Sequence, residues 1–389
     1  MIDYGKVLNK TVTDIKPSGI RKFFDIAATM DDVISLGVGE PDFQTPWAIR
    51  KAGIDSLQKG KTKYTSNWGL IQLREEIAKY SKLKFNIEYD PQNEILVTVG
   101  GSEAIDAAIR AVVNFGDEVI IPQPSYVCYE PITSLAGGKP VIVNTKAEND
   151  FKLTAEELKD AITPKTKVLI LPYPSNPTGA IMEREDLQEI AEVLKGTDIL
   201  VLSDEIYAEL TFSGNPHVSI ASIDGMWERT ITVNGFSKAF SMTGWRLGYA
   251  CGPKPLIDQI TKIHQFAIMS SPTTSQYAAI EALRNCEEDV QYMLNEYNMR
   301  RRMMVSSFNS IGLECREPKG AFYAFPSIKS TGMTSDEFCE KLLYAKKVAV
   351  VPGTAFGESG EGFIRASYCY SVEHIKEALA RIEEFLKEI

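Results

Sequence analysis

Several patterns that define common protein classes are missing from this chain of 389 residues. Only three histidines are present, which gives little support for a histidine-based metal site or hydrolase triad. The six cysteines include no C-x-x-C pair, so neither a disulfide framework nor a zinc site is expected. A net charge of −10 opposes binding to nucleic acid or to an anionic membrane surface, because no basic excess exists to replace counterions.

Long apolar runs are also missing. No stretch approaches the ~18 apolar residues needed to cross a bilayer, and the first residues carry no apolar signal region. We therefore expect a soluble, cytoplasmic protein. One basic run, Arg300–Arg302, lies among helix-forming residues, and we interpret it as a solvated helix face.

The middle of the chain alternates short apolar runs with helix-like segments. The runs are rich in Val and Ile and are bounded by Gly, Pro or Asp, as is typical of strands buried on both faces. They are Ile95–Val99, Glu118–Ile121, Val141–Val143, Val168–Leu171, Ile199–Leu202, Thr230–Val233 and Leu247–Cys251. Helical periodicity between them, for example over Thr154–Ala161 and Arg184–Leu194, predicts crossovers onto a mainly parallel sheet. The predicted fold class is α/β, with about seven strands flanked by helices.

The C-terminal part has a different pattern. A long helical pattern over Pro272–Ser310 precedes two short predicted strands, Ala321–Phe325 and Phe363–Ser367, and Val372–Ile389 predicts a final amphipathic helix. The length favours about two domains of ~100–200 residues. We expect an N-terminal segment (1–45) that packs with the small domain, a large α/β domain (46–280) and a small α+β domain (281–389).

Polar residues follow several predicted strands, at the carboxyl ends where open α/β sheets bind ligands. Gly100–Ala104 opens a helix whose backbone N–H groups suit a phosphate, although Gly-Gly-Ser is also an ordinary capped turn. Pro172–Gly179 is equally typical of a rigid surface turn. Asp204 ends a buried strand, where a carboxylate needs a cation or several donors, and it is either a helix N-cap or a ligand to a cation.

Lys238 and Arg246 follow the next predicted strand and lie among apolar and small residues. Most lysines are surface charges. A lysine flanked by Phe236, Phe240 and Trp245 at a strand end is partly desolvated, which lowers its pKa and frees the neutral amine to form an imine.

Together the strand ends supply an amine, a carboxylate, an arginine and a candidate phosphate cradle. Pyridoxal 5′-phosphate (PLP) uses each of them: an amine for a Schiff base, a carboxylate that keeps the pyridine nitrogen protonated, and donors for the phosphate. The sequence has no G-x-G-x-x-G opening a βαβ unit, no G-x-x-x-x-G-K-[ST] and no H-E-x-x-H. We therefore predict a PLP enzyme in which Lys238 holds the cofactor.

At these motifs the sequence resembles the class I/II aminotransferases of PLP fold type I, over nearly its whole length. Ser237–Arg246 is similar to the family's lysine signature, and Asn176–Gly179 and Ser203–Tyr207 lie upstream in the family's order and approximate spacing. Gly37–Phe43 and Phe363–Arg365 also match. The resemblance implies a PLP-transferase fold and an aminotransferase activity.

The resemblance also implies a role for each residue around the cofactor ring. Lys238 would form the Schiff base and, once released, move a proton between the substrate Cα and the cofactor C4′. Asp204 would pair with the pyridinium nitrogen. Asn176 and Tyr207 would donate to the 3′-oxygen, and Tyr126 would stack on the ring face.

Further residues would bind the phosphate and the substrate. The phosphate ligands implied by the resemblance are Gly101, Ser102, Ser237 and Arg246, with Tyr64 reaching the cofactor of the neighbouring subunit. Arg365 would clamp the substrate α-carboxylate bidentately, with Asn176 beside it, and Gly39 would let the backbone approach that carboxylate. A site shared in this way implies a homodimer, and the pathway would be ping-pong.

The resemblance is less specific about the substrate. Ser102 stands where one aspartate-specific subgroup has lysine, and His264–Pro272 lacks the arginine of another. Pro17–Phe24 is similar to aromatic, broad-specificity and aminotransferase A-like members. We expect aromatic or broad L-amino acid donors with 2-oxoglutarate as acceptor. A C–S β-lyase and an aspartate aminotransferase are the alternative enzymes, and a PLP-binding transcriptional regulator is the alternative outside catalysis.

Overall fold

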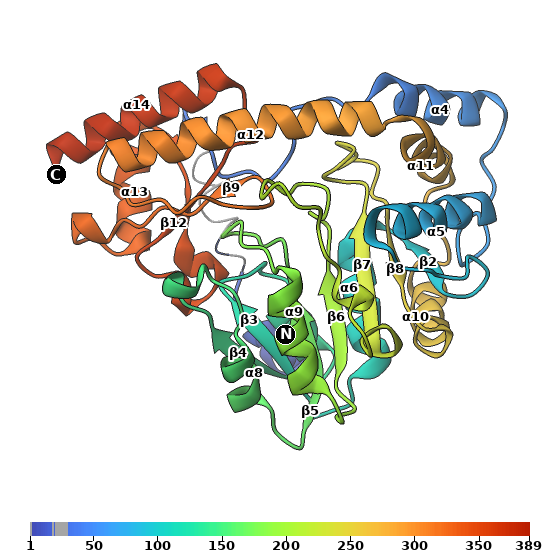
Figure 1. Cartoon of the computed structure of the whole chain (residues 1–389). Coiled ribbons are helices and arrows are strands. Elements are labelled where there is room, and N and C mark those ends of the chain that lie inside the picture. Colours follow the sequence, from blue (N-terminus) through green and yellow to red (C-terminus); the bar gives the residue numbers. More distant parts are fainter. Residues whose placement is uncertain (1, 18, 20–29) are drawn as a thin grey trace.

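The computed structural model describes residues 2–17, 19 and 30–389, and Figure 1 shows the course of the chain. The segment Pro17–Phe24, which is similar to aromatic and broad-specificity aminotransferases, lies mostly outside the described residues, because residues 18 and 20–24 are not described. None of the helices in the described part has the length and apolar character of a membrane span. Two short helices, α1 (Tyr4–Val7) and α2 (Lys10–Asp14), begin the chain, and α2 contacts α7 (Tyr129–Leu135).

A seven-stranded sheet with the strand order β2-β8-β7-β6-β5-β3-β4 forms the centre of the molecule's larger part. The strands are β2 Ile95–Thr98, β3 Glu118–Gln123, β4 Lys139–Asn144, β5 Thr166–Leu171, β6 Leu200–Asp204, β7 Thr230–Gly235 and β8 Gly248–Cys251. All pairings are parallel except those of β8, which runs antiparallel to β2 and β7. The predicted α/β fold with a mainly parallel sheet is confirmed.

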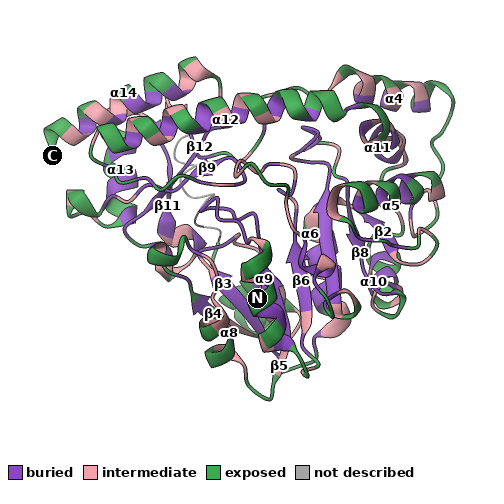
Figure 2. Cartoon of the chain, in the orientation of Figure 1, coloured by how far each residue is buried: buried purple, intermediate pink, exposed green. Residues whose placement is uncertain are grey.

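Alternate residues of the central strands pack against opposite helical layers. Leu169 and Val201 lie in a buried cluster with side chains of α8 and α9. Ile170 and Leu202 lie in another cluster, with side chains of α6 and α10. These four helices span Ala155–Ala161 (α8), Arg184–Leu194 (α9), Gly100–Val112 (α6) and Lys254–Ala267 (α10). Because both faces of the sheet are covered, the strands are apolar at consecutive positions, and Figure 2 shows them buried.

The helical pattern predicted over Pro272–Ser310 forms two helices, α11 (Thr273–Asn285) and α12 (Glu287–Ser310), which meet at Cys286. Helix α11 packs on α4 (Trp47–Gln58) and also contacts α5 (Ile71–Phe85). From there α12 runs along the molecule to the C-terminal helices, as Figure 1 shows.

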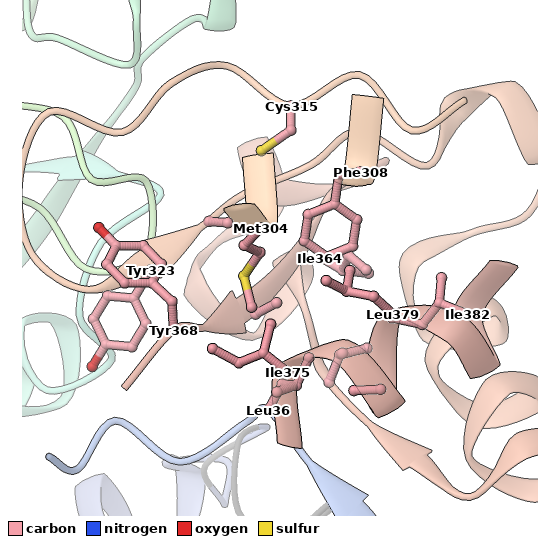
Figure 3. Close-up of a cluster of buried hydrophobic side chains, with 14 of the residues drawn as sticks. Leu36, Met304, Phe308, Cys315, Tyr323, Ile364, Tyr368, Ile375, Leu379 and Ile382 are labelled. Carbon is pink, nitrogen blue, oxygen red and sulfur yellow. The ribbon is translucent and has the colours of Figure 1, made fainter. Parts of the chain in front are cut away.

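The C-terminal part is a small α+β unit around an antiparallel sheet with the strand order β11-β12-β9. Its elements are β9 Tyr323–Ala324, α13 Ser335–Lys346, β10 Val348–Ala349, β11 Val351–Pro352, β12 Ile364–Ser367 and α14 Val372–Glu388. Figure 3 shows its core, in which Phe308 of α12, Ile364 of β12 and Ile382 of α14 pack together. Strand β1 (Ile34–Ser35) pairs with β10, and the adjacent Leu36 lies in the same core.

The expectation that Arg300–Arg302 forms a solvated helix face is wrong for two of the three residues, whereas Arg302 is exposed on α12 as expected. Arg300 and Arg301 are buried. Arg300 pairs with Asp42 at 2.8 Å, and Arg301 pairs with Glu317 at 2.6 Å. Each guanidinium finds a carboxylate from a segment distant in sequence, so the local pattern of charges could not reveal the burial.

Candidate active site

A cavity of about 920 Å³ lies at the carboxyl ends of the central parallel strands. Nearly all of the predicted site residues line it: Gly39, Gly101, Ser102, Tyr126, Asn176, Asp204, Tyr207, Ser237, Lys238, Arg246 and Arg365. The exception is Tyr64, which is 82% exposed and does not line this cavity. Strand ends from both parts of the molecule therefore bring together residues that are far apart in the sequence.

Lys238 lies just after β7, and its side chain enters the cavity. Its Nζ donates a 2.7 Å hydrogen bond to the carbonyl oxygen of Gly39 and lies 5.5 Å from the ring centre of Phe322. Burial lowers the pKa of Lys238 to about 8. The predicted neighbours Phe236 and Phe240 instead belong to a core cluster that also contains residues of the neighbouring strands. The desolvation was thus predicted correctly, but another ring faces the amine.

Asp204 is buried at the end of β6. Tyr129 Oη donates to its Oδ2 at 2.7 Å, and the N–H of Ile206 donates to its Oδ1 at 3.3 Å. Burial raises the pKa of Asp204, and these two hydrogen bonds oppose the rise. A buried carboxylate with so few donors is stabilised by a cation, and the protonated nitrogen of a pyridine ring meets that need.

The N-terminus of α6 and a guanidinium form an anion site at one end of the cavity. Gly100 has φ +76°, and a Cβ at this position would lie 2.9 Å from Nη2 of Arg246. The glycine therefore lets the guanidinium approach the first turn of the helix, which contains Gly101 and Ser102. Arg246 is fixed by a 3.0 Å hydrogen bond from Nη1 to the carbonyl oxygen of Thr243. A helix N-terminus beside an arginine fits a phosphate group.

Arg365 is buried on β12 at another wall of the cavity. Its Nη1 donates to Oδ1 of Asn176 at 2.8 Å, and its Nη2 donates to the carbonyl oxygen of Gly37. The guanidinium carbon lies 4.4 Å from the ring centre of Tyr323 and 4.8 Å from that of Phe356. The Nε–H is buried without an acceptor among the described residues. A fixed guanidinium with an unused donor fits a carboxylate ligand.

Four lining residues with polar side chains were not predicted from the sequence: Glu40, Tyr129, Thr243 and Tyr323. Thr243 Oγ1 donates to Oε1 of Glu40, which joins the two segments that carry Gly39 and Lys238. Both residues lie inside the quoted motifs, so their position there was an available signal. Tyr129 begins helix α7 three residues after the predicted Tyr126, and the two rings meet edge to face with centres 6.0 Å apart.

The lysine amine, the buried carboxylate, the anion site and the clamped arginine surround one cavity in an α/β sheet. PLP presents complementary groups: an aldehyde, a pyridine nitrogen and a phosphate. The fold and this arrangement define a PLP-dependent enzyme of fold type I.

Known proteins of similar sequence and structure identify the family. The sequence profile described as Aminotransferase class I and II matches residues 31–382. The chain is 56% identical to the putative aminotransferase YugH of Bacillus subtilis (strain 168), over 97% of this chain and 98% of that protein. It is 49% identical to the aspartate aminotransferase of Pyrococcus abyssi, over 96% and 97% of the two chains. The crystal structure of the aromatic aminotransferase from Pyrococcus horikoshii OT3 matches with a TM-score of 0.90 at 46% identity, over 94% and 99% of the two chains.

The chain therefore belongs to the class I and II aminotransferases and is a PLP-dependent aminotransferase. The predicted family, activity and cofactor are confirmed.

Proposed function

We propose that this aminotransferase moves the amino group of an aromatic or broad range of L-amino acids to a 2-oxo acid such as 2-oxoglutarate, by a ping-pong pathway. The observation that supports this substrate class is that Val38, Tyr126 and Tyr323 line the same cavity as Arg365. Such a wall suits an apolar or aromatic substrate side chain better than a charged one.

The charges of the cavity support the same proposal. Its described lining contains three cationic side chains, Lys238, Arg246 and Arg365. Each has a place in the binding of PLP or of the α-carboxylate. The described lining therefore supplies no further cation for the second carboxylate of a dicarboxylic donor.

Aspartate is the second candidate donor, because a relative with 49% identity is named an aspartate aminotransferase. The C–S β-lyase is not favoured, since the family profile and the relatives described above are aminotransferases.

In the proposed mechanism, bound PLP supplies an electron sink that stabilises negative charge at the substrate Cα. Lys238 would hold the cofactor through Nζ. As a free amine, Nζ would move the proton between the substrate Cα and the cofactor C4′. Because burial lowers its pKa to about 8, a larger fraction of this amine is neutral near neutral pH than in a solvated lysine.

The other residues hold the reacting groups in place. Asp204 would keep the proton on the pyridine nitrogen. Asn176 and Tyr207 would donate to the 3′-oxygen, and Tyr126 would stack on the ring. The proposed phosphate ligands are Gly101, Ser102, Ser237 and Arg246, and the proposed α-carboxylate ligands are Gly39, Asn176 and Arg365. A substrate fixed at both ends presents its Cα–H bond perpendicular to the ring, which favours proton removal over decarboxylation.

We also propose a homodimer in which Tyr64 reaches the phosphate site of the partner. The side chain of Tyr64 is 82% exposed. A residue that binds the phosphate in the cavity of its own subunit would be buried. Beside the loop of Tyr64, Nδ2 of Asn67 donates to the carbonyl oxygen of Met269, and both Met269 and the nearby Phe266 are exposed. Exposed large apolar side chains of this kind support an interface. Light scattering tests the dimer, and weaker PLP binding by Tyr64→Phe tests the shared site.

The proposed domain division is 1–45, 46–280 and 281–389. Pairing of β1 with β10 supports packing of the N-terminal segment with the small domain. A cytoplasmic location is proposed because the six cysteines are free.

The substrate proposal is tested by half-reactions without an oxo acid. Tyrosine, phenylalanine, methionine, alanine and aspartate are added singly to the PLP-loaded enzyme, and the absorbance change of the cofactor gives each rate. We expect the aromatic donors to react roughly tenfold faster than aspartate. A faster reaction with aspartate would favour the second candidate, and catalytic release of pyruvate and ammonia would favour the lyase. Phenylpyruvate and 2-oxoglutarate are then compared as acceptors.

A further inference from the structure

Tyr323 of β9 lines the cavity although its side chain is almost completely buried, at 1% exposure. Figure 3 places it at the edge of the C-terminal core cluster. It therefore belongs both to the core of the small unit and to the wall of the active site. No role follows for it from the binding of PLP or from the family motifs considered above.

The hydroxyl group of Tyr323 meets the hydroxyl group of Tyr207. The two Oη atoms are 2.9 Å apart, and the rings are perpendicular neighbours with centres 6.0 Å apart. Burial raises the pKa of Tyr323 to about 12 and raises the pKa of Tyr207 well above its ordinary value. Both phenols are thus protonated near neutral pH. One of the two hydroxyl protons forms the hydrogen bond between the tyrosines. The other hydroxyl proton can be donated to a third group.

The ring and hydroxyl of Tyr323 also shape the carboxylate end of the cavity. Its ring centre lies 4.4 Å from the guanidinium carbon of Arg365, and Phe356 lies on the same guanidinium at 4.8 Å. These contacts restrict the plane of the guanidinium. The Tyr323 hydroxyl also fills the space next to Gly39, where an added Cβ would overlap it.

We propose that Tyr323 is a positioning residue that ties the α-carboxylate clamp to the donor for the cofactor 3′-oxygen. Its hydroxyl donates to Tyr207 Oη, so that the Tyr207 proton is directed at the 3′-oxygen, and its ring holds Arg365 in the plane that meets the carboxylate. This inference rests on the roles proposed above for Tyr207 and Arg365.

Two substitutions separate the role of the Tyr323 hydroxyl from the role of its ring. Tyr323→Phe keeps the ring and removes the hydroxyl. We expect the pH midpoint of the visible absorbance of bound PLP to rise by roughly 0.5–1 unit, because a weaker donor stabilises the ionised 3′-oxygen less. We also expect the dissociation constant of 3-phenylpropionate, a carboxylate without an amino group, to change by less than about threefold in calorimetry.

Tyr323→Leu removes the ring as well. We expect the same midpoint shift as in Tyr323→Phe, together with roughly tenfold weaker binding of 3-phenylpropionate. Tyr368→Phe is the matched control, because Tyr368 is also fully buried in the core cluster and its hydroxyl donates to the carbonyl oxygen of Ala321 at 3.1 Å. This control is expected to leave both quantities unchanged.

A double-mutant cycle tests whether Tyr323 acts through Tyr207. In a Tyr207→Phe background, Tyr323→Phe should cause no further midpoint shift. Additive shifts would overturn the inference, as would a normal midpoint in Tyr323→Phe alone or equal carboxylate binding by the Phe and Leu variants. An unchanged midpoint in Tyr207→Phe would contradict the role proposed for Tyr207, and the inference with it.

Discussion

The hydroxyl of Tyr129 donates a 2.7 Å hydrogen bond to Oδ2 of Asp204. The first residue of helix α7 thereby supports the carboxylate that ends β6. Burial raises the pKa of Asp204, and the hydrogen bond from Tyr129 is the largest of the effects that oppose the rise. The tyrosine therefore helps to keep the buried carboxylate ionised for the pyridine nitrogen.

Tyr129→Phe removes this donor, so the pKa of Asp204 should rise further. Asp204 acts as an anion above its pKa, and activity should therefore be lost at a higher pH than in wild type as the pH falls. We expect a kcat reduced about tenfold and a several-fold weaker affinity for PLP. Steady-state kinetics across the acidic range and cofactor titration measure both.

Tyr173→Phe is the matched control for this prediction. Tyr173 is buried, and its hydroxyl donates to the carbonyl oxygen of Phe151 at 3.1 Å, but it does not line the cavity. An equal effect of the two substitutions on the pH profile would mean that Tyr129 has only a structural role.

Gly39→Ala should weaken the binding of every amino donor, because the new Cβ overlaps the hydroxyl of Tyr323. We expect KM to rise roughly tenfold or more. Adding Tyr323→Phe removes the overlapping oxygen and should restore part of the loss, since the ring carbon Cζ still lies 3.0 Å from the new Cβ. A double variant no better than Gly39→Ala would show that another contact excludes the side chain.

The uptake of PLP by the apoenzyme should follow the ionisation of Lys238. Burial disfavours the ammonium form, so the folded-state pKa of about 8 lies below that of a solvated lysine. The neutral amine is populated as the pH rises, and the association rate should therefore increase with pH and level off above about 8. Stopped-flow absorbance measures this rate. A rate that keeps rising toward ~10.4, the pKa of a solvated lysine, would contradict the desolvated environment.

Arg365→Lys should lower kcat/KM about 100-fold, because an ammonium cannot make the bidentate contact of a guanidinium. The loss should be similar for every donor, since all share the α-carboxylate. Arg316→Lys is the control: Arg316 forms an exposed ion pair with Asp150 at 2.8 Å, outside the cavity. A loss confined to one class of donor would instead assign Arg365 to the substrate side chain.

The central sheet was predictable because its strands, except the edge strand β4, are buried on both faces and so appear as continuous apolar runs. All seven predicted runs overlap strands of the sheet. Their spatial order and the antiparallel direction of β8 were not predictable, because periodicity carries no information about neighbours. The short strands β10 and β11 have too few residues to show a period.

Site residues were predictable where they stand at strand ends or inside specific motifs, as Lys238 and Asp204 do. Tyr323 was missed because it lies in the apolar run Ala321–Phe325, where a tyrosine fits an ordinary strand. Its contacts with Tyr207 and Arg365 exist only in the folded chain. The burial of Arg300 escaped prediction for the same reason.

The most direct test of the account is the absorbance of PLP-loaded wild type and Lys238→Ala after addition of tyrosine without an oxo acid. Wild type should change its spectrum once and release one equivalent of the 2-oxo acid per active site. Lys238→Ala should bind PLP and tyrosine but release 2-oxo acid more than about 1000-fold more slowly. Release by the variant at the wild-type rate, or a wild type that binds no PLP, would contradict the account.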